Sequence, residues 1–164
     1  LDALPHMVAE KNGELFEKYG VLSKRELESR YEILLEQYFY TINIEGETAA
    51  DLGRTRILPA ANRYLGELLT TAERASEVGV KVEGVMAQAK ALAGLVDGLS
   101  GALDHLVKQN AELGGDDVHS KAQHMRDNIV PAAKAVRVIA DELEKIIPDD
   151  LWPMPTYREM LHIK

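Results

Sequence analysis

The chain of 164 residues contains no cysteine, few aromatic residues and no long hydrophobic run. The absence of cysteine excludes disulfides and thiolate metal sites, and it fits a reducing compartment, so we expect a cytoplasmic protein. The longest uninterrupted run of apolar residues and glycine extends only from Ala91 to Val96, whereas a membrane-spanning helix needs about 20 residues. We therefore expect no membrane partner.

The sequence also lacks an excess of basic residues. It has 27 acidic against 19 basic side chains, which gives a net charge of −8. The basic side chains alternate with acidic ones, as in Lys24-Arg25-Glu26, so they form no basic stripe that could attract a phosphate backbone. We therefore expect no nucleic-acid partner.

The few aromatic residues are confined to the two ends of the chain, and none falls between Leu65 and Leu151. Aromatic side chains bury a large area and usually anchor cores and interfaces. The two ends are therefore predicted to pack against something bulky, and the middle is predicted to be a helical scaffold. The aromatic residues are Phe16, Tyr19, Tyr31, Tyr38, Phe39, Tyr40, Tyr64, Trp152 and Tyr157.

A first long helix is predicted over residues 24–77. Ser23 and Glu26 have the spacing of a capping box, which marks a helix start. No convincing stop follows until Gly79. Pro59 lacks an N–H and crowds the preceding turn, so we expect a bend there.

Two further helices are predicted over 80–113 and 116–147, because apolar residues recur there in steps of four and three. Glycine and aspartate at 114–117 stop the second helix and start the third. A second capping box, Thr156 with Glu159, predicts a short C-terminal helix. The fold class is thus predicted to be all-α: an antiparallel bundle of three long helices with a short N-terminal helix and a short C-terminal helix.

The first predicted helix is about 20 residues longer than the other two, so it should overhang them at one end. We interpret residues 1–164 as a single helical domain, with residues 1–40 and 148–164 forming an aromatic docking base and residues 45–147 a protruding bundle. The predicted docking and interface residues are Leu15, Phe16, Tyr31, Tyr38, Trp152 and Tyr157.

No pattern of catalytic or metal-binding residues is found. His119 and His124 are five apart and so lie about 140° from each other around a helix. Glu159 and His162 form one Glu-x-x-His unit, whereas a di-iron bundle needs two. We assign no catalytic, cofactor-binding or metal-binding residue to this chain.

Several segments resemble the C-terminal region of the large, type III glutamine synthetases: residues 15–38 (LFEKYGVLSKRELESRYEILLEQY), 42–45 (INIE), 57–61 (ILPAA) and 150–161 (DLWPMPTYREML). The resemblance covers both ends of the chain and thins across about 78–128. Gly46 follows INIE where relatives would carry alanine, which bears on helix continuity there.

This resemblance implies that the chain is a piece of a longer enzyme that joins ammonia to glutamate. It implies ATP and Mg or Mn as cofactors of that enzyme, bound by upstream motifs, and none in this piece. It also implies contact with the catalytic region of the same chain and with neighbouring subunits, in a homo-oligomer of stacked hexameric rings. The expected role is structural, in docking or oligomer assembly.

Two other interpretations stay open. The chain could be a free-standing helical interaction module that recruits a partner helix along the seam of Leu92, Leu99 and Leu106. Alternatively, the bundle could hold a metal or small ligand of its own. The second alternative requires convergent polar groups in the core, and the predicted seams contain almost none.

Overall fold

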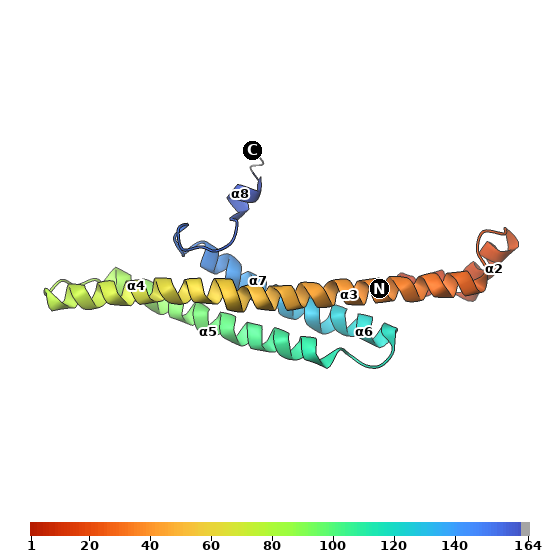
Figure 1. Ribbon diagram of the computed structural model, residues 1–164, viewed down its shortest axis with the longest axis horizontal. Coiled ribbons are helices and arrows are strands. Elements are labelled where there is room, and N and C mark those ends of the chain that lie inside the picture. Colours follow the sequence, from red (N-terminus) through yellow and green to blue (C-terminus); the bar gives the residue numbers. More distant parts are fainter. Residues whose placement is uncertain (162–164) are drawn as a thin grey trace. The chain divides into compact units, whose positions relative to one another are not determined.

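The computed structural model describes residues 1–161, apart from the side chain of Tyr157, and all regular structure in this part is helical (Figure 1). The predicted all-α class is therefore confirmed. The elements in chain order are α1 (Leu4–Met7), α2 (Glu10–Lys18), α3 (Lys24–Leu52), the π-helical turn η1 (Gly53–Ile57), α4 (Leu58–Glu77), α5 (Glu83–Glu112), α6 (Val118–His124), the π-helical turn η2 (Met125–Ile129), α7 (Val130–Glu144) and α8 (Tyr157–Leu161).

The first helical stretch has the predicted bounds, because α3, η1 and α4 follow one another without a break over 24–77. The predicted capping box is present: the backbone N–H of Ser23 donates to the Glu26 carboxylate at 2.8 Å, and the N–H of Glu26 lies 3.3 Å from the Ser23 hydroxyl oxygen. Helix α3 also continues through Gly46.

Each of the two prolines within the long helical stretches follows a π-helical turn. Pro59 follows η1, in which the N–H of Leu58 bonds the carbonyl of Gly53, and Pro131 follows η2, in which the N–H of Val130 bonds the carbonyl of Met125. Proline has no N–H to continue the regular four-residue ladder. The preceding turn widens to a five-residue hydrogen bond in both cases. The bend at Pro59 stays a prediction.

Helix α5 begins at Glu83, three residues after the predicted start. Gly79, with φ +76°, ends α4: its N–H bonds the carbonyl of Ser76 at 3.0 Å, and the N–H of Val80 bonds that of Ala75 at 2.8 Å. This pair of bonds is the Schellman motif. Val80 and Val82, which follow Gly79, are β-branched and therefore poor helix formers. Helix α5 begins after them at Glu83, whose negative charge favours a helix N-terminus.

The third stretch is also shorter than predicted, with α6, η2 and α7 covering 118–144 in place of 116–147. Its start is set by the N-cap Asp117, whose carboxylate accepts from the N–H of Ser120 at 2.9 Å. The N-terminal segment contains two short helices, α1 and α2, where one was predicted. Gly20, with φ +64°, ends α2 in a second Schellman arrangement.

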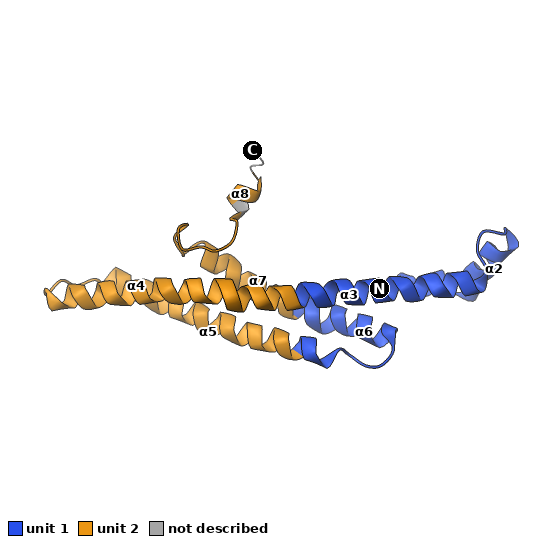
Figure 2. Ribbon diagram, in the orientation of Figure 1, with its two compact units in different colours: residues 1–46, 109–131 blue, residues 47–108, 132–164 orange. Residues whose placement is uncertain are grey.

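The chain divides into two compact units (Figure 2). Unit 1 comprises Leu1–Gly46 and Gln109–Pro131. In unit 1, Tyr31 of α3 contacts His119 of α6, and Lys121 of α6 lies over the ring of Phe39 of α3. These contacts place the two helices side by side with the same chain direction. The apolar core of unit 1 consists of Leu27, Leu35, Phe39, Ala122, Met125 and Ile129.

Unit 2 comprises Glu47–Lys108 and Ala132–Lys164. Arg54 of η1 pairs with Asp104 of α5 at 2.7 Å, and Gln88 near the other end of α5 bonds the Tyr64 hydroxyl of α4 at 2.8 Å. The first stretch and α5 therefore run antiparallel. Leucines of the predicted α5 seam form much of the core of unit 2. The buried apolar residues of this unit are Ala50, Ile57, Ala60, Ala61, Leu68, Ala89, Leu92, Leu99, Leu103, Leu106, Ala132, Val136, Leu143 and Ile147.

The predicted division into a docking base and a protruding bundle stays a prediction, and the two compact units divide the chain differently. Residues 1–40 fall in unit 1 and residues 148–164 in unit 2, while residues 109–131 of the predicted bundle belong to unit 1. A base shared by both ends of the chain stays a prediction.

Candidate docking site

Leu15 and Phe16, the first two predicted docking residues, lie on the short helix α2. Leu15 is 50% exposed and Phe16 is half-buried. Helix α2 approaches the start of α3 through Gly13, where a Cβ atom would stand 3.5 Å from Cγ of Lys24. Phe16 also supplies the carbonyl that accepts the N–H of Val21 at 2.9 Å, so its backbone position is fixed by the cap of α2. Leu15 is therefore available to a partner, whereas Phe16 also contributes to the packing and capping of α2 in this chain.

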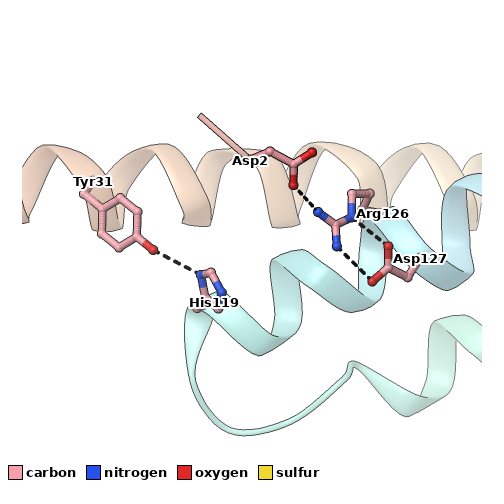
Figure 3. A network of polar contacts seen from close by, with 5 residues as sticks. All are labelled: Asp2, Tyr31, His119, Arg126 and Asp127. Carbon is pink, nitrogen blue, oxygen red and sulfur yellow. Dashed lines mark hydrogen bonds and ion pairs between the residues drawn. The ribbon is translucent and has the colours of Figure 1, made fainter. Parts of the chain in front are cut away.

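Tyr31 and Tyr38 are half-buried and lie on α3 in unit 1. The hydroxyl oxygen of Tyr31 is 3.1 Å from Nδ1 of His119 (Figure 3). This bond holds the Tyr31 hydroxyl against α6. Tyr31 thus contributes to the packing of unit 1 as well as to any interface.

A second polar contact in unit 1 involves Arg126, which ties the start of the chain to η2 (Figure 3). Its guanidinium donates to the Asp2 carboxylate at 2.6 Å and to the Asp127 carboxylate at 2.6 Å. The hydrogen bond from Arg126 lowers the pKa of Asp127, and the same bond raises the pKa of Arg126. Asp2 is 92% exposed, so this ion pair contributes little to stability.

His124 has a partner at both ring nitrogens. Nε2 lies 2.9 Å from the carbonyl oxygen of Gln109, and Nδ1 lies 3.1 Å from the amide nitrogen of Asn128. Because a carbonyl oxygen can only accept, the Nε2–H of His124 donates to Gln109. A Cβ atom at Gly114, whose φ is +83°, would overlap Cβ of His124. His124 therefore fastens the turn between α5 and α6.

Trp152 lies in the extended segment after α7. It is half-buried, and its indole Nε1 is shielded from solvent without an acceptor. The segment forms an open groove of about 970 Å³, lined in part by Trp152, Met154 and Pro155. Tyr157 begins α8, which Thr156 and Glu159 cap as predicted. The Tyr157 side chain lies outside the described residues.

Exposed apolar residues in unit 1 extend beyond the predicted docking set. Tyr19 is 70% and Val21 is 60% exposed beside Leu15. Helix α3 adds Ile33, Tyr40 and Ile44, each more than half exposed. Their spacings of seven and four are a helical-face signal, but the sequence alone does not tell this face from the core face.

Among residues 1–161, no three histidine, aspartate or glutamate side chains come together as a group that could hold a metal ion. The carboxylates with recorded partners are engaged in helix caps or in ion pairs such as that of Arg54 and Asp104. This part of the chain therefore offers no such group of ligands for Mg²⁺ or Mn²⁺. No described helix is long and apolar enough to cross a membrane.

Comparison with known proteins matches residues 1–76 to the family model "Glutamine synthetase C-terminal domain". A type-3 glutamine synthetase of Dictyostelium discoideum is 30% identical over 175 residues, with 99% of this chain and 23% of the relative aligned. Glutamine synthetases of Bacteroides fragilis and Butyrivibrio fibrisolvens are 28% and 29% identical, with 99% and 98% of this chain aligned. The chain spans about a quarter (23%) of the length of each of these curated relatives.

Proposed function

The chain is a relative of the C-terminal region of type III glutamine synthetases, and we propose that it forms the C-terminal helical domain of such an enzyme. In this proposal the parent enzyme joins ammonia to glutamate with ATP and a divalent metal, works in the cytoplasm and assembles as a homo-oligomer of stacked hexameric rings. The domain docks on the catalytic region and on neighbouring subunits, and it supplies no catalytic residue.

The proposal rests on how much of each sequence is aligned in the comparison with the Dictyostelium discoideum relative. Practically the whole chain, 99%, aligns with a protein of which it fills only 23%. A match of this kind is what one domain of a larger polypeptide gives. The family model is itself named for a C-terminal domain, and it matches α1, α2, α3, η1 and nearly all of α4.

The exposed apolar side chains support a docking role. Leu15, Tyr19 and Val21 expose half or more of their surface, and each would bury apolar area against a partner at about 25 cal/mol per Å². Trp152 is half-buried, and its indole N–H is shielded from solvent without an acceptor among the described residues. Tryptophan is a favoured anchor of interfaces because its ring has a large apolar area.

The proposed chemistry is assigned to the rest of the enzyme. The described residues hold no group of three carboxylate or histidine ligands for a divalent metal, and the proposal assigns no step of the ligation to them. The isolated 164-residue chain should therefore form no glutamine when it is supplied with glutamate, ammonia, ATP and Mg²⁺ or Mn²⁺. Glutamine formation by the isolated chain would refute this part of the proposal.

The assembly role is tested in the full enzyme that carries this chain, by removal of residues 1–164. Mass photometry gives the oligomer distribution, and a glutamine-forming assay gives the activity. We expect loss of the full oligomer in the truncated enzyme. An enzyme that assembles and works equally well without the domain would overturn the proposal.

A point variant makes the same test with the fold retained. Trp152→Ala should shift the oligomer distribution towards smaller species, because it removes the proposed anchor from the groove. The matched control is Val138→Ala on α7, which trims a side chain that is 55% exposed and lies outside the proposed docking set. Equal behaviour of the two variants would argue against Trp152 as an anchor.

A further inference from the structure

Helix α3 exposes an apolar stripe within unit 1, formed by Ile33, Tyr40 and Ile44. Their side chains are 56%, 58% and 60% exposed. At about 100° per residue, the three positions lie within about 40° of one another around the helix. We call this surface the outer stripe of α3.

The outer stripe faces away from the core of its own unit. Leu35, with no exposed surface, lies about 160° around the helix from Ile33. Leu27 and Phe39 are buried on the same side as Leu35. Helix α3 is therefore apolar on two opposite faces, and this chain covers only one of them.

We propose that the outer stripe of α3 binds an apolar groove on the catalytic region of the parent enzyme, and that lysine or arginine side chains line the rim of that groove. This inference rests on the proposed function, because it names the surface through which the domain docks. It extends the proposal from the ends of the chain to the length of α3.

The charges beside the stripe decide between the catalytic region and a second copy of this chain. Glu32 and Glu36 flank the stripe on one side, whereas the other side carries Arg30 and the neutral Gln37 and Thr41. In an antiparallel pair of identical helices, equivalent flanks face each other, so a second copy would place the glutamates against glutamates. The net charge of −8 adds repulsion between copies.

The lengths of the relatives point to the same partner. The chain corresponds to 23% of each curated relative, so 100 − 23 = 77% of such a polypeptide lies outside it. A covalently linked region is present at a high effective concentration, and it therefore competes well against any separate protein. A groove with a basic rim on that region would satisfy both the stripe and its acidic flank.

Photo-crosslinking in the full enzyme tests this assignment. The photo-reactive amino acid p-benzoyl-phenylalanine replaces Tyr40, because it preserves an aromatic ring at the centre of the stripe. The control carries the same amino acid at Val138, which is similarly exposed at 55%. Peptide mapping by mass spectrometry identifies the crosslinked partner.

We expect Tyr40 to crosslink to peptides that precede residue 1 of this chain, with lysine or arginine nearby, and Val138 to give none of these crosslinks. Ile44→Asp introduced beside the photo-reactive position should abolish the crosslink. Crosslinks to residues 24–52 of a second copy, or no crosslink at all, would overturn the inference.

The same enzyme separates this inference from the proposed function. If removal of residues 1–164 breaks the oligomer but Tyr40 crosslinks to nothing upstream, the inference fails and the assembly role stands. If the truncated enzyme assembles and works normally while Tyr40 crosslinks upstream, the assembly role fails and the docking surface stands.

Discussion

Replacement of Gly46 by alanine should destabilise the chain, although alanine is the better helix former. Gly46 lies inside α3, where a Cβ atom would stand 2.8 Å from Oδ1 of Asn110 and 2.8 Å from Cγ2 of Ile129. Both contacts are well inside van der Waals distance. Cγ2 branches directly from the Ile129 Cβ, so it can yield only if the side chain changes rotamer or the backbone moves.

Two opposing effects decide whether Gly46→Ala raises or lowers the free energy of unfolding. The change from glycine to alanine in a helix interior gains up to about 1 kcal/mol of propensity. Forcing an extra methyl group into a packed site typically costs about 1–3 kcal/mol. We therefore expect Gly46→Ala to lower the free energy of unfolding by up to about 2 kcal/mol.

Gly94→Ala is the matched control, because Gly94 also lies inside a long helix but a Cβ atom there meets nothing within 4 Å. It should raise the free energy of unfolding by about 0.5–1 kcal/mol. Urea unfolding followed by circular dichroism measures both variants in the 164-residue chain, with the midpoints compared at equal m-value. If Gly46→Ala stabilises the chain as much as Gly94→Ala does, the close approach of α3 to Asn110 and Ile129 is wrong.

Three further predictions concern the core, a helix cap and a surface ion pair. Leu103→Ala should cost about 2–5 kcal/mol in urea unfolding, since Leu103 is 1% exposed; a cost below that of Val138→Ala would contradict the assigned core. Ser23→Ala should cost about 1 kcal/mol. Bonds from the backbone N–H and then from the hydroxyl of Ser23 lower the pKa of Glu26 in the folded chain, so the cap's contribution is present above the unfolded pKa and is lost as pH falls through the folded value. Ser23→Ala keeps the backbone bond and removes the hydroxyl, so an NMR titration should show the Glu26 pKa rising part of the way towards its ordinary value; an unchanged pKa would refute the hydroxyl bond. Asp2→Ala should leave the urea midpoint unchanged, because its partner Arg126 is at the surface.

Residues that act through local geometry were predictable from the sequence. Ser23 with Glu26, Thr156 with Glu159, and Asp117 after Gly114 mark helix ends through bonds that span only a few residues. The buried face of α5 was also predictable, because leucines that recur in steps of four and three lie on one side of a helix. The start of this helix was not predicted correctly, because it was expected at residue 80 and α5 begins at Glu83.

Contacts between distant segments were beyond the sequence. Nothing near Tyr31 indicates that its hydroxyl meets His119, which is 88 positions away. The π-helical turns before Pro59 and Pro131 were also not predicted. The helix can accommodate the missing N–H of a proline either by a bend or by a wider turn, and the sequence does not decide between the two. The segments ILPAA at 57–61 and IVPAA at 129–133 are similar, and the structure has a π-helical turn before the proline of each.

The pattern of α3 explains why the docking surface was the hardest part to predict. Between Ile33 and Ile44 the apolar residues fall on two opposite faces of the helix, with polar residues between them, so periodicity gives no single buried face. The structure resolves the ambiguity by burying Leu35 and Phe39 and leaving Ile33 and Tyr40 more than half exposed. The composition of α3 is therefore explained only if a second body covers its outer stripe, and that body is what the crosslink from Tyr40 should identify.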